Sequence, residues 1–116
     1  MTLVSTNWLN ENLNKVKIID CSWHMPLTQR DGYNEYLEEH IPEAIFFDID
    51  KNSEPNTDLP HMLPKASYFQ KIVSELGINN EDQIVIYDNS DVFSACRCWF
   101  SFFYFGHNSK KLSVLN

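Results

Sequence analysis

Glycine and positive charge are both scarce in this chain. Only three glycines occur in 116 residues, Gly32, Gly77 and Gly106, and no two are close together. A phosphate-binding loop needs several glycines within a few residues, so the sequence argues against a nucleotide site. Nine Lys and Arg face sixteen Asp and Glu, which gives a net charge of -7 without a basic cluster. We therefore expect no nucleic-acid partner and no membrane partner.

Long hydrophobic runs are also missing. The amino-terminal stretch MTLVSTNWLNENL has neither the cationic region nor the apolar region of a signal peptide. The most aromatic run, CWFSFFYF, is far shorter than the roughly 18 apolar residues of a membrane span. Three cysteines, an odd number without a secretory signal, are typical of free thiols in a reducing compartment. The expected location is cytoplasmic.

The composition is that of one folded domain. Hydrophobic residues make up 43% of the chain and charged residues 22%. A chain of 116 residues can bury one core but is too short for two ordinary domains, so residues 1–116 are expected to form a single domain. Its last apolar segment, residues 112–115, ends just before the chain does, which predicts a domain truncated at its C-terminus.

Apolar segments alternate with amphipathic ones, which predicts an α/β fold. Continuous apolar runs indicate a parallel sheet flanked by helices on both faces, with a site at the carboxyl ends of the strands. The predicted strands are residues 15–20, 44–49, 84–88 and 112–115. The predicted helices are a short one capped by Ser5 or Thr6, then residues 32–41, 65–76 and 94–105. Between the second strand and the helix at residues 65–76, residues 51–64 form a proline-rich loop long enough to suggest a function.

The three cysteines and the acidic segment FFDIDKN are candidate sites that the sequence does not support. Cys96 and Cys98 are two apart on a helix and point to opposite sides, so they cannot share a metal, and we expect both to be packing residues. Cys21 also reads as structural. In FFDIDKN, Asp48 and Asp50 lack the Thr of an aspartate phosphatase and the Gly and Glu of a calcium loop. No metal site and no cofactor are predicted.

His61 is the more promising residue. It lies in DLPHMLP between two prolines that stiffen the loop, near the strand ends. Asp50, eleven residues earlier, is a possible partner that would fix the imidazole tautomer and assist proton transfer. Asp88 draws attention for a different reason, because it stands at the turn from a strand into a helix, where many α/β enzymes hold a nucleophile. A phosphoacceptor role for Asp88 would need an acidic pair after the first strand, where only Asp20 is present.

The segment YLEEHIPEAIFFDID resembles a family signature, aromatic-x-x-x-His-Ile-Pro-Gly-Ala, found in rhodanese-type sulfurtransferases. The matching residues are Tyr36, His40, Ile41, Pro42 and Ala44. With DLPHMLP and YDNSDVFSACRCWFSFFYFGH following in the same order, the chain from Leu3 to Leu115 resembles the N-terminal, non-catalytic domain of a two-domain thiosulfate or 3-mercaptopyruvate sulfurtransferase. The resemblance implies a rhodanese-like fold.

The resemblance also implies roles for the site residues. In that family the persulfide-forming cysteine belongs to the C-terminal domain, and the N-terminal domain has Asp at the equivalent turn, here Asp88. The implied pseudo-active-site loop comprises Asp88, Asn89, Ser90, Asp91, Val92, Phe93 and Ser94. His61 with Asp50 becomes an auxiliary catalytic pair that reaches a C-terminal catalytic rhodanese domain, the implied partner, and a small anionic sulfur donor. The isolated chain is expected to be inactive.

Other residues are implied to be structural, and some depart from the family pattern. His40 and Pro42 belong to the motif, Arg30 is an expected ion-pair partner, and Arg97 is expected to tie the loop to its helix. Glu43 replaces a Gly that would favour positive φ, at an expected cost of about 1 kcal/mol. Two alternatives remain: a non-enzymatic pseudoenzyme or vestigial fragment that binds a separate catalytic domain, and a one-domain rhodanese that uses Cys21.

Overall fold

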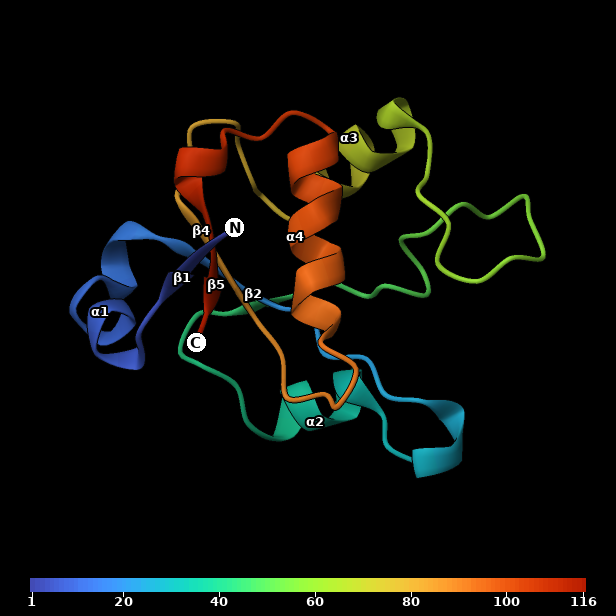
Figure 1. Cartoon of the computed structure of the whole chain (residues 1–116), viewed down its shortest axis with the longest axis horizontal. Coiled ribbons are helices and arrows are strands. Elements are labelled where there is room, and N and C mark those ends of the chain that lie inside the picture. Colours follow the sequence, from blue (N-terminus) through green and yellow to red (C-terminus); the bar gives the residue numbers. More distant parts are fainter.

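A five-stranded parallel sheet forms the centre of the molecule (Figure 1). The computed structural model describes residues 1–116. The strands are β1 (Thr2–Val4), β2 (Lys17–Asp20), β3 (Ile45–Phe46), β4 (Ile84–Tyr87) and β5 (Leu112–Leu115). Their order is β1-β5-β4-β2-β3, and every neighbouring pair is parallel. The predicted parallel sheet is confirmed.

Two strand predictions need correction. β1 was not predicted, because its three residues are mostly exposed and show no hydrophobic run. The strand predicted for residues 44–49 is paired only at Ile45 and Phe46. Phe47 still donates its N–H to the Asp20 carbonyl at 2.9 Å, after which the chain leaves the sheet and turns, with Asn52 N–H bonded to the Asp48 carbonyl. The hydrophobic run is longer than the strand because Phe47 and Ile49, which follow the paired residues, are buried in the core.

The helices are close to those predicted, and local signals set their ends. They are α1 (Thr6–Glu11), α2 (Gly32–Glu38), α3 (Ala66–Glu75) and α4 (Ser94–Tyr104), with 3-10 turns η1 (Leu13–Lys15), η2 (Pro26–Thr28) and η3 (Ser109–Lys111). Ser5 caps α1 by accepting the Trp8 N–H at 3.0 Å, as predicted. Gly77 and Gly106 follow α3 and α4 with φ of 80° and 98°. No helix is both long and apolar enough to span a membrane.

Helices cover both faces of the sheet, as the sequence predicts. On one face, Phe69 of α3 and Phe102 of α4 pack in the larger core, which includes Ile19, Ile86 and Val114. On the other face, a smaller cluster joins Leu9 of α1 to Ile18 and Val85. The alternation of neighbouring residues between the two clusters follows from the pleat of the strands. The carboxyl ends of β2 and β4 lie side by side because Asp20 is in register with Tyr87.

Candidate functional site

The turn from β4 into α4 is closed by the carboxylate of Asp88. We call residues 88–94 the elbow loop. Asp88 Oδ1 accepts the Ser90 N–H at 3.1 Å, and Oδ2 accepts the Ala95 N–H at 2.6 Å in the first turn of α4. Backbone N–H groups at a helix N-terminus favour an anion. In this chain the anion is the protein's own side chain.

The elbow loop is tied to the end of β2 as well. Asn89 donates its N–H to Ser22 Oγ at 3.0 Å, and Ser22 Oγ donates to Asp20 Oδ1 at 2.6 Å. Inside the loop, the hydroxyls of Ser90 and Ser94 lie 3.0 Å apart. Asp20, Ser22 and Ser94 are all buried. The loop is therefore held by a hydrogen-bonded network across the ends of two neighbouring strands.

His61 and Asp50 form the predicted pair. His61 Nε2 lies 2.6 Å from Asp50 Oδ1, and the histidine side chain is 23% exposed. The second oxygen of Asp50, Oδ2, accepts the indole N–H of Trp23 at 3.0 Å. The Trp23 ring meets the His61 ring edge to face, with 4.7 Å between centroids. His61 has φ of 57°, a left-handed conformation that is uncommon outside glycine.

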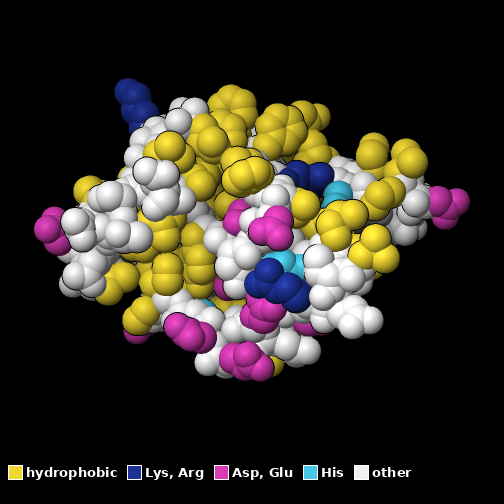
Figure 2. Space-filling model, turned by 60° about the horizontal axis from the view of Figure 1, so that its bottom comes forward, with side chains coloured by type: hydrophobic (Ala, Val, Ile, Leu, Met, Phe, Trp, Pro, Cys, Tyr) yellow, Lys and Arg dark blue, Asp and Glu magenta, His cyan; other side chains and the backbone are white.

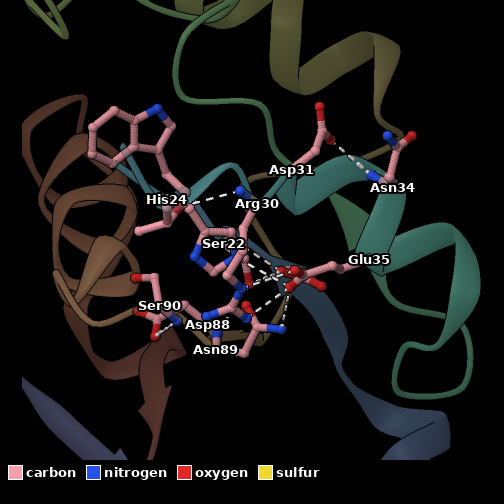
Figure 3. Close-up of polar contacts among 12 residues, drawn as sticks. Ser22, His24, Arg30, Asp31, Asn34, Glu35, Asp88, Asn89 and Ser90 are labelled. Carbon is pink, nitrogen blue, oxygen red and sulfur yellow. Dashed lines mark hydrogen bonds and ion pairs between the residues drawn. The ribbon is translucent and has the colours of Figure 1, made fainter. Parts of the chain in front are cut away.

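A second cluster of charged residues, centred on Glu35, was not predicted (Figure 3). Arg30 donates from Nε to Glu35 Oε2 and from Nη2 to Oε1, both at 2.9 Å. Asn89 Nδ2 donates to the same Oε1 at 3.1 Å, and the ring of buried His24 lies 3.2 Å from it. The Arg30 hydrogen bonds are the main reason that the pKa of Glu35 falls to about 2. The Glu35 cluster thus joins α2 to the elbow loop.

Part of that cluster was accessible to sequence reasoning. The expected ion-pair role of Arg30 is confirmed, and its partner is five residues ahead at the start of α2. His24 and Asn89 could not be assigned, because they belong to segments that meet only when the sheet forms. The one sequence signal for His24 is a histidine four residues after the predicted end of a strand and two before Pro26, which does not reveal its partner.

The cysteines divide into two buried and one exposed. Cys21 and Cys98 have no exposed surface, as expected for packing residues, whereas Cys96 is exposed. The packing prediction for Cys96 is wrong because α4 turns Ala95, Cys98 and Phe102 toward the core and leaves position 96 outside. Burial, helped by the neighbouring Cys98, raises the pKa of the Cys21 thiol well above its ordinary value. No group of three or more potential ligand side chains is arranged to hold a metal ion.

The motif around His40 is structural in its contacts. The His40 ring stacks on Tyr36 at 4.1 Å, and its Nδ1 lies 2.6 Å from the Tyr36 carbonyl oxygen. After Pro42 the chain makes a tight turn in which Glu43 has φ of 67°, so the positive φ predicted there is confirmed. The turn is closed by the Tyr36 hydroxyl, which donates to the Ala44 carbonyl at 2.6 Å.

Arg97 does not link the elbow loop to α4 in the way expected. Its Nε lies 3.4 Å from the hydroxyl of Ser101, one turn further along the same helix. None of its hydrogen bonds reaches residues 88–94. The loop is instead attached to the helix through Asp88 and the two serines, because short side chains at the turn reach the first N–H groups of α4 directly.

Hydrophobic side chains are exposed around the site. Leu59 and Met62 flank His61, and Val92 and Phe93 lie in the elbow loop, with Phe93 72% exposed. The outer side of α4 adds Phe100, Phe103 and Tyr104. Figure 2 shows hydrophobic side chains gathered on this face next to charged side chains and histidine. Apolar surface of this kind, rimmed by polar groups, is typical of an interaction site.

Known proteins resemble this chain over its whole length. A family model described as a rhodanese-like domain matches residues 5–116. The chain is 49% identical over 116 residues to thiosulfate/3-mercaptopyruvate sulfurtransferase 1, mitochondrial, of Arabidopsis thaliana, covering 98% of this chain and 30% of the relative. It is 42% identical over 118 residues to the 3-mercaptopyruvate sulfurtransferase of Rattus norvegicus, covering 95% and 40%.

Solved structures of sulfur transferases also resemble this chain. The crystal structure of the 3-mercaptopyruvate sulfotransferase SseA from Escherichia coli matches with a TM-score of 0.91 and 38% identity, covering 100% of this chain and 45% of that chain. A sulfur transferase subunit of yeast mitochondrial complex I matches with a TM-score of 0.90 and 34% identity. The chain therefore spans between 30% and 45% of the length of the Arabidopsis, rat and Escherichia coli relatives.

Proposed function

The chain belongs to the rhodanese-like domain family, and from this membership we propose that it is the half of a sulfurtransferase that lacks the persulfide-forming cysteine. The reaction would move sulfane sulfur from thiosulfate or 3-mercaptopyruvate to a thiophilic acceptor such as cyanide or a thiol. The relatives that cover the chain carry these two donors in their names. The matched segment is only 30% to 45% of their length, which leaves room for a second domain.

The observation that carries the proposal is the carboxylate at the elbow. Asp88 accepts two backbone N–H groups where a catalytic rhodanese domain would hold a thiolate. The same donors stabilise either anion, which explains how the turn persists without a cysteine. A carboxylate cannot form a persulfide, and Cys21, the one thiol close to a strand end, is buried. We therefore expect no turnover from this chain alone.

We assign the Asp50–His61 pair an auxiliary catalytic role at the thiolate of a partner domain. Asp50 holds Nε2 of the imidazole, and Nδ1 makes no hydrogen bond within the chain. A ring fixed on one nitrogen and free on the other can polarise a hydroxyl or relay a proton to a group that approaches from outside. The exposed apolar residues on both sides, Met62 and Phe93 among them, would pack against that domain.

The partner in this proposal is a catalytic rhodanese domain, covalently attached or separately encoded. The small anionic donor would be gripped by that domain, because the present chain carries a net charge of -7. The alternative is a non-enzymatic pseudoenzyme or vestigial fragment that occupies the same surface. Glu43 favours this alternative. It has positive φ at a position where the family has glycine, so the chain carries backbone strain that a family member with glycine avoids.

The test compares three proteins in cyanide assays with each donor. These are the chain alone, the chain mixed with a rhodanese domain that has cysteine at its elbow, and a chimera in which residues 1–116 replace the matched segment of the Arabidopsis relative. We expect activity in the chimera, none in the chain alone, and a loss of activity in the chimera on His61→Gln. Activity of the chain alone would contradict the proposal, whether or not it survives replacement of all three cysteines by Ser, and a folded but inactive chimera would favour the fragment.

A further inference from the structure

Trp23 touches both halves of the candidate site. Its backbone N–H donates to Ser94 Oγ at 3.1 Å, and its indole N–H donates to Asp50 Oδ2 at 3.0 Å. Its ring also packs edge to face against His61. No other residue is bonded to the first residue of α4 and to the Asp50–His61 pair at once. No sequence motif points to this tryptophan.

The two ends of this connection differ in rigidity. Ser94 is buried and begins α4, whereas the Asp50 side chain is 66% exposed and belongs to a long irregular segment. An exposed carboxylate rotates freely unless both oxygens are engaged. The indole N–H engages Oδ2 and thereby turns Oδ1 toward Nε2 of His61. A functional side chain is usually held in its productive orientation by neighbouring side chains whose own rotamers are fixed by packing and hydrogen bonds.

We propose that Trp23 is the positioning residue for the Asp50–His61 pair, anchored to the elbow loop through Ser94 and holding the carboxylate through its indole N–H. The proposal rests on the role proposed above for that pair. Trp23 itself takes no part in the proton transfer proposed for the pair. Its contribution is to keep the imidazole in one tautomer with Nδ1 unprotonated, because a carboxylate fixed at Nε2 holds the proton on that nitrogen.

The first test needs no catalytic activity. At a pH at which the ring is neutral, nitrogen-15 NMR of the His61 ring in the whole chain should show a single tautomer, protonated at Nε2. Trp23→Phe keeps an aromatic ring but removes the N–H donor, so the His61 ring signals should average between the two tautomers. Trp8→Phe, in α1 and far from the pair in the sequence, is the matched control and should leave these signals unchanged. A wild-type His61 spectrum in folded Trp23→Phe would overturn the proposal.

The second test uses the chimera. Trp23→Phe should lower kcat about 10-fold with KM unchanged, which is the size of effect usual for residues that orient a functional side chain. In a chimera that already carries Asp50→Asn, adding Trp23→Phe should lower kcat no further, because both substitutions disrupt the same hydrogen-bonded arrangement. Losses that multiply would overturn the proposal. If Trp23→Phe does not fold, Ser94→Ala, which removes the backbone anchor, should also loosen the His61 ring, and an unchanged ring would refute the connection.

The two proposals fail in different ways. If His61→Gln leaves the chimera at full activity, the auxiliary role of the pair is wrong, while the NMR result still decides whether Trp23 positions it. If Asp50→Asn slows the chimera but Trp23→Phe does not, the pair acts as proposed and the positioning role of Trp23 is wrong.

Discussion

The Asp88 carboxylate accepts the Ala95 N–H at 2.6 Å, so an acidic side chain from the end of β4 closes the first turn of α4. This contact gives Asp88 a structural role that is independent of chemistry. Short side chains with an acceptor oxygen are preferred at helix starts because they satisfy N–H groups that have no partner in the helix.

Removing that side chain should destabilise the fold. Asp88→Ala leaves the N–H groups of Ser90 and Ala95 without their acceptor, and we expect the free energy of unfolding to fall by about 1–3 kcal/mol. Asp88→Asn keeps one acceptor oxygen and should cost less. Urea unfolding measures the difference. Asp91→Ala is the control, because that exposed side chain lies in the same loop and accepts no hydrogen bond; an equal loss in both alanine variants would contradict the role given to Asp88.

Acid should weaken the fold through Glu35. The pKa of Glu35 is lowered from 4.5 to about 2, first by the Arg30 hydrogen bonds. A carboxyl group whose pKa is lower in the folded state stabilises the fold fully above its unfolded pKa, and this contribution is lost as the pH falls from about 4.5 to about 2. Glu35→Gln should therefore flatten the loss of stability in that window.

Unfolding midpoints in urea across the same pH window test this prediction. Glu38→Gln is the control, since Glu38 is exposed on the same helix and makes no ion pair. Arg30→Gln should move the carboxyl titration of Glu35, followed by carbon NMR, back toward its ordinary range. Parallel acid curves for the wild type and Glu35→Gln would show that other carboxyl groups govern acid unfolding.

Replacing Glu43 should stabilise the fold. Glu43 has φ of 67°, where a side chain is strained and glycine is not. Relief of this strain by Glu43→Gly is expected to raise the free energy of unfolding by about 1 kcal/mol. The greater conformational entropy of glycine in the unfolded chain will offset part of that gain. Glu75→Gly, in the last turn of α3, is the same substitution at helical φ and should destabilise. Thermal unfolding of both variants would reveal the contrast, and a destabilised Glu43→Gly would mean that the side chain makes a compensating contact.

The three thiols should differ in reactivity. Cys96 is exposed, whereas Cys21 and Cys98 are fully buried and burial raises the pKa of Cys21. Alkylation of the native chain followed by mass spectrometry should find one modified residue, Cys96, and all three after denaturation. Cys96→Ser should remove the fast reaction. A second thiol that reacts at the rate of Cys96 would show that the core around Cys21 and Cys98 opens readily.

Local signals predicted much of this fold. The Ser5 cap and the Gly77 and Gly106 stops are set by residues within one turn of the helix end, so the sequence contains the whole cause. The Asp50–His61 pair was also accessible, because the two residues are only eleven positions apart in one irregular segment. The bounds of β3 were not, because backbone pairing ends at Phe46 while burial continues to Ile49.

Contacts between distant segments were out of reach. His24, Glu35 and Asn89 meet only once β2 and β4 are side by side, and Trp23 reaches Ser94 across 71 positions of sequence. Cys96 was misplaced although α4 begins at Ser94 as predicted, because the burial of Cys96 depends on which face of the helix packs against the sheet. The residues that join the site together are therefore those for which a single sequence offers the least information.

The two outermost strands of the sheet are also its shortest. β1 has three residues and β3 has two, while β5, which ends the chain, lies inside the sheet between β1 and β4. Another chain can pair with an edge strand through the strand's unpaired backbone N–H and C=O groups, and a longer edge strand presents more of them. These edges present very few. Copies of this chain therefore have little template for strand-to-strand association, and any self-association would be mediated by side chains of the exposed aromatic residues on α4, which detergent could reverse and added salt would not.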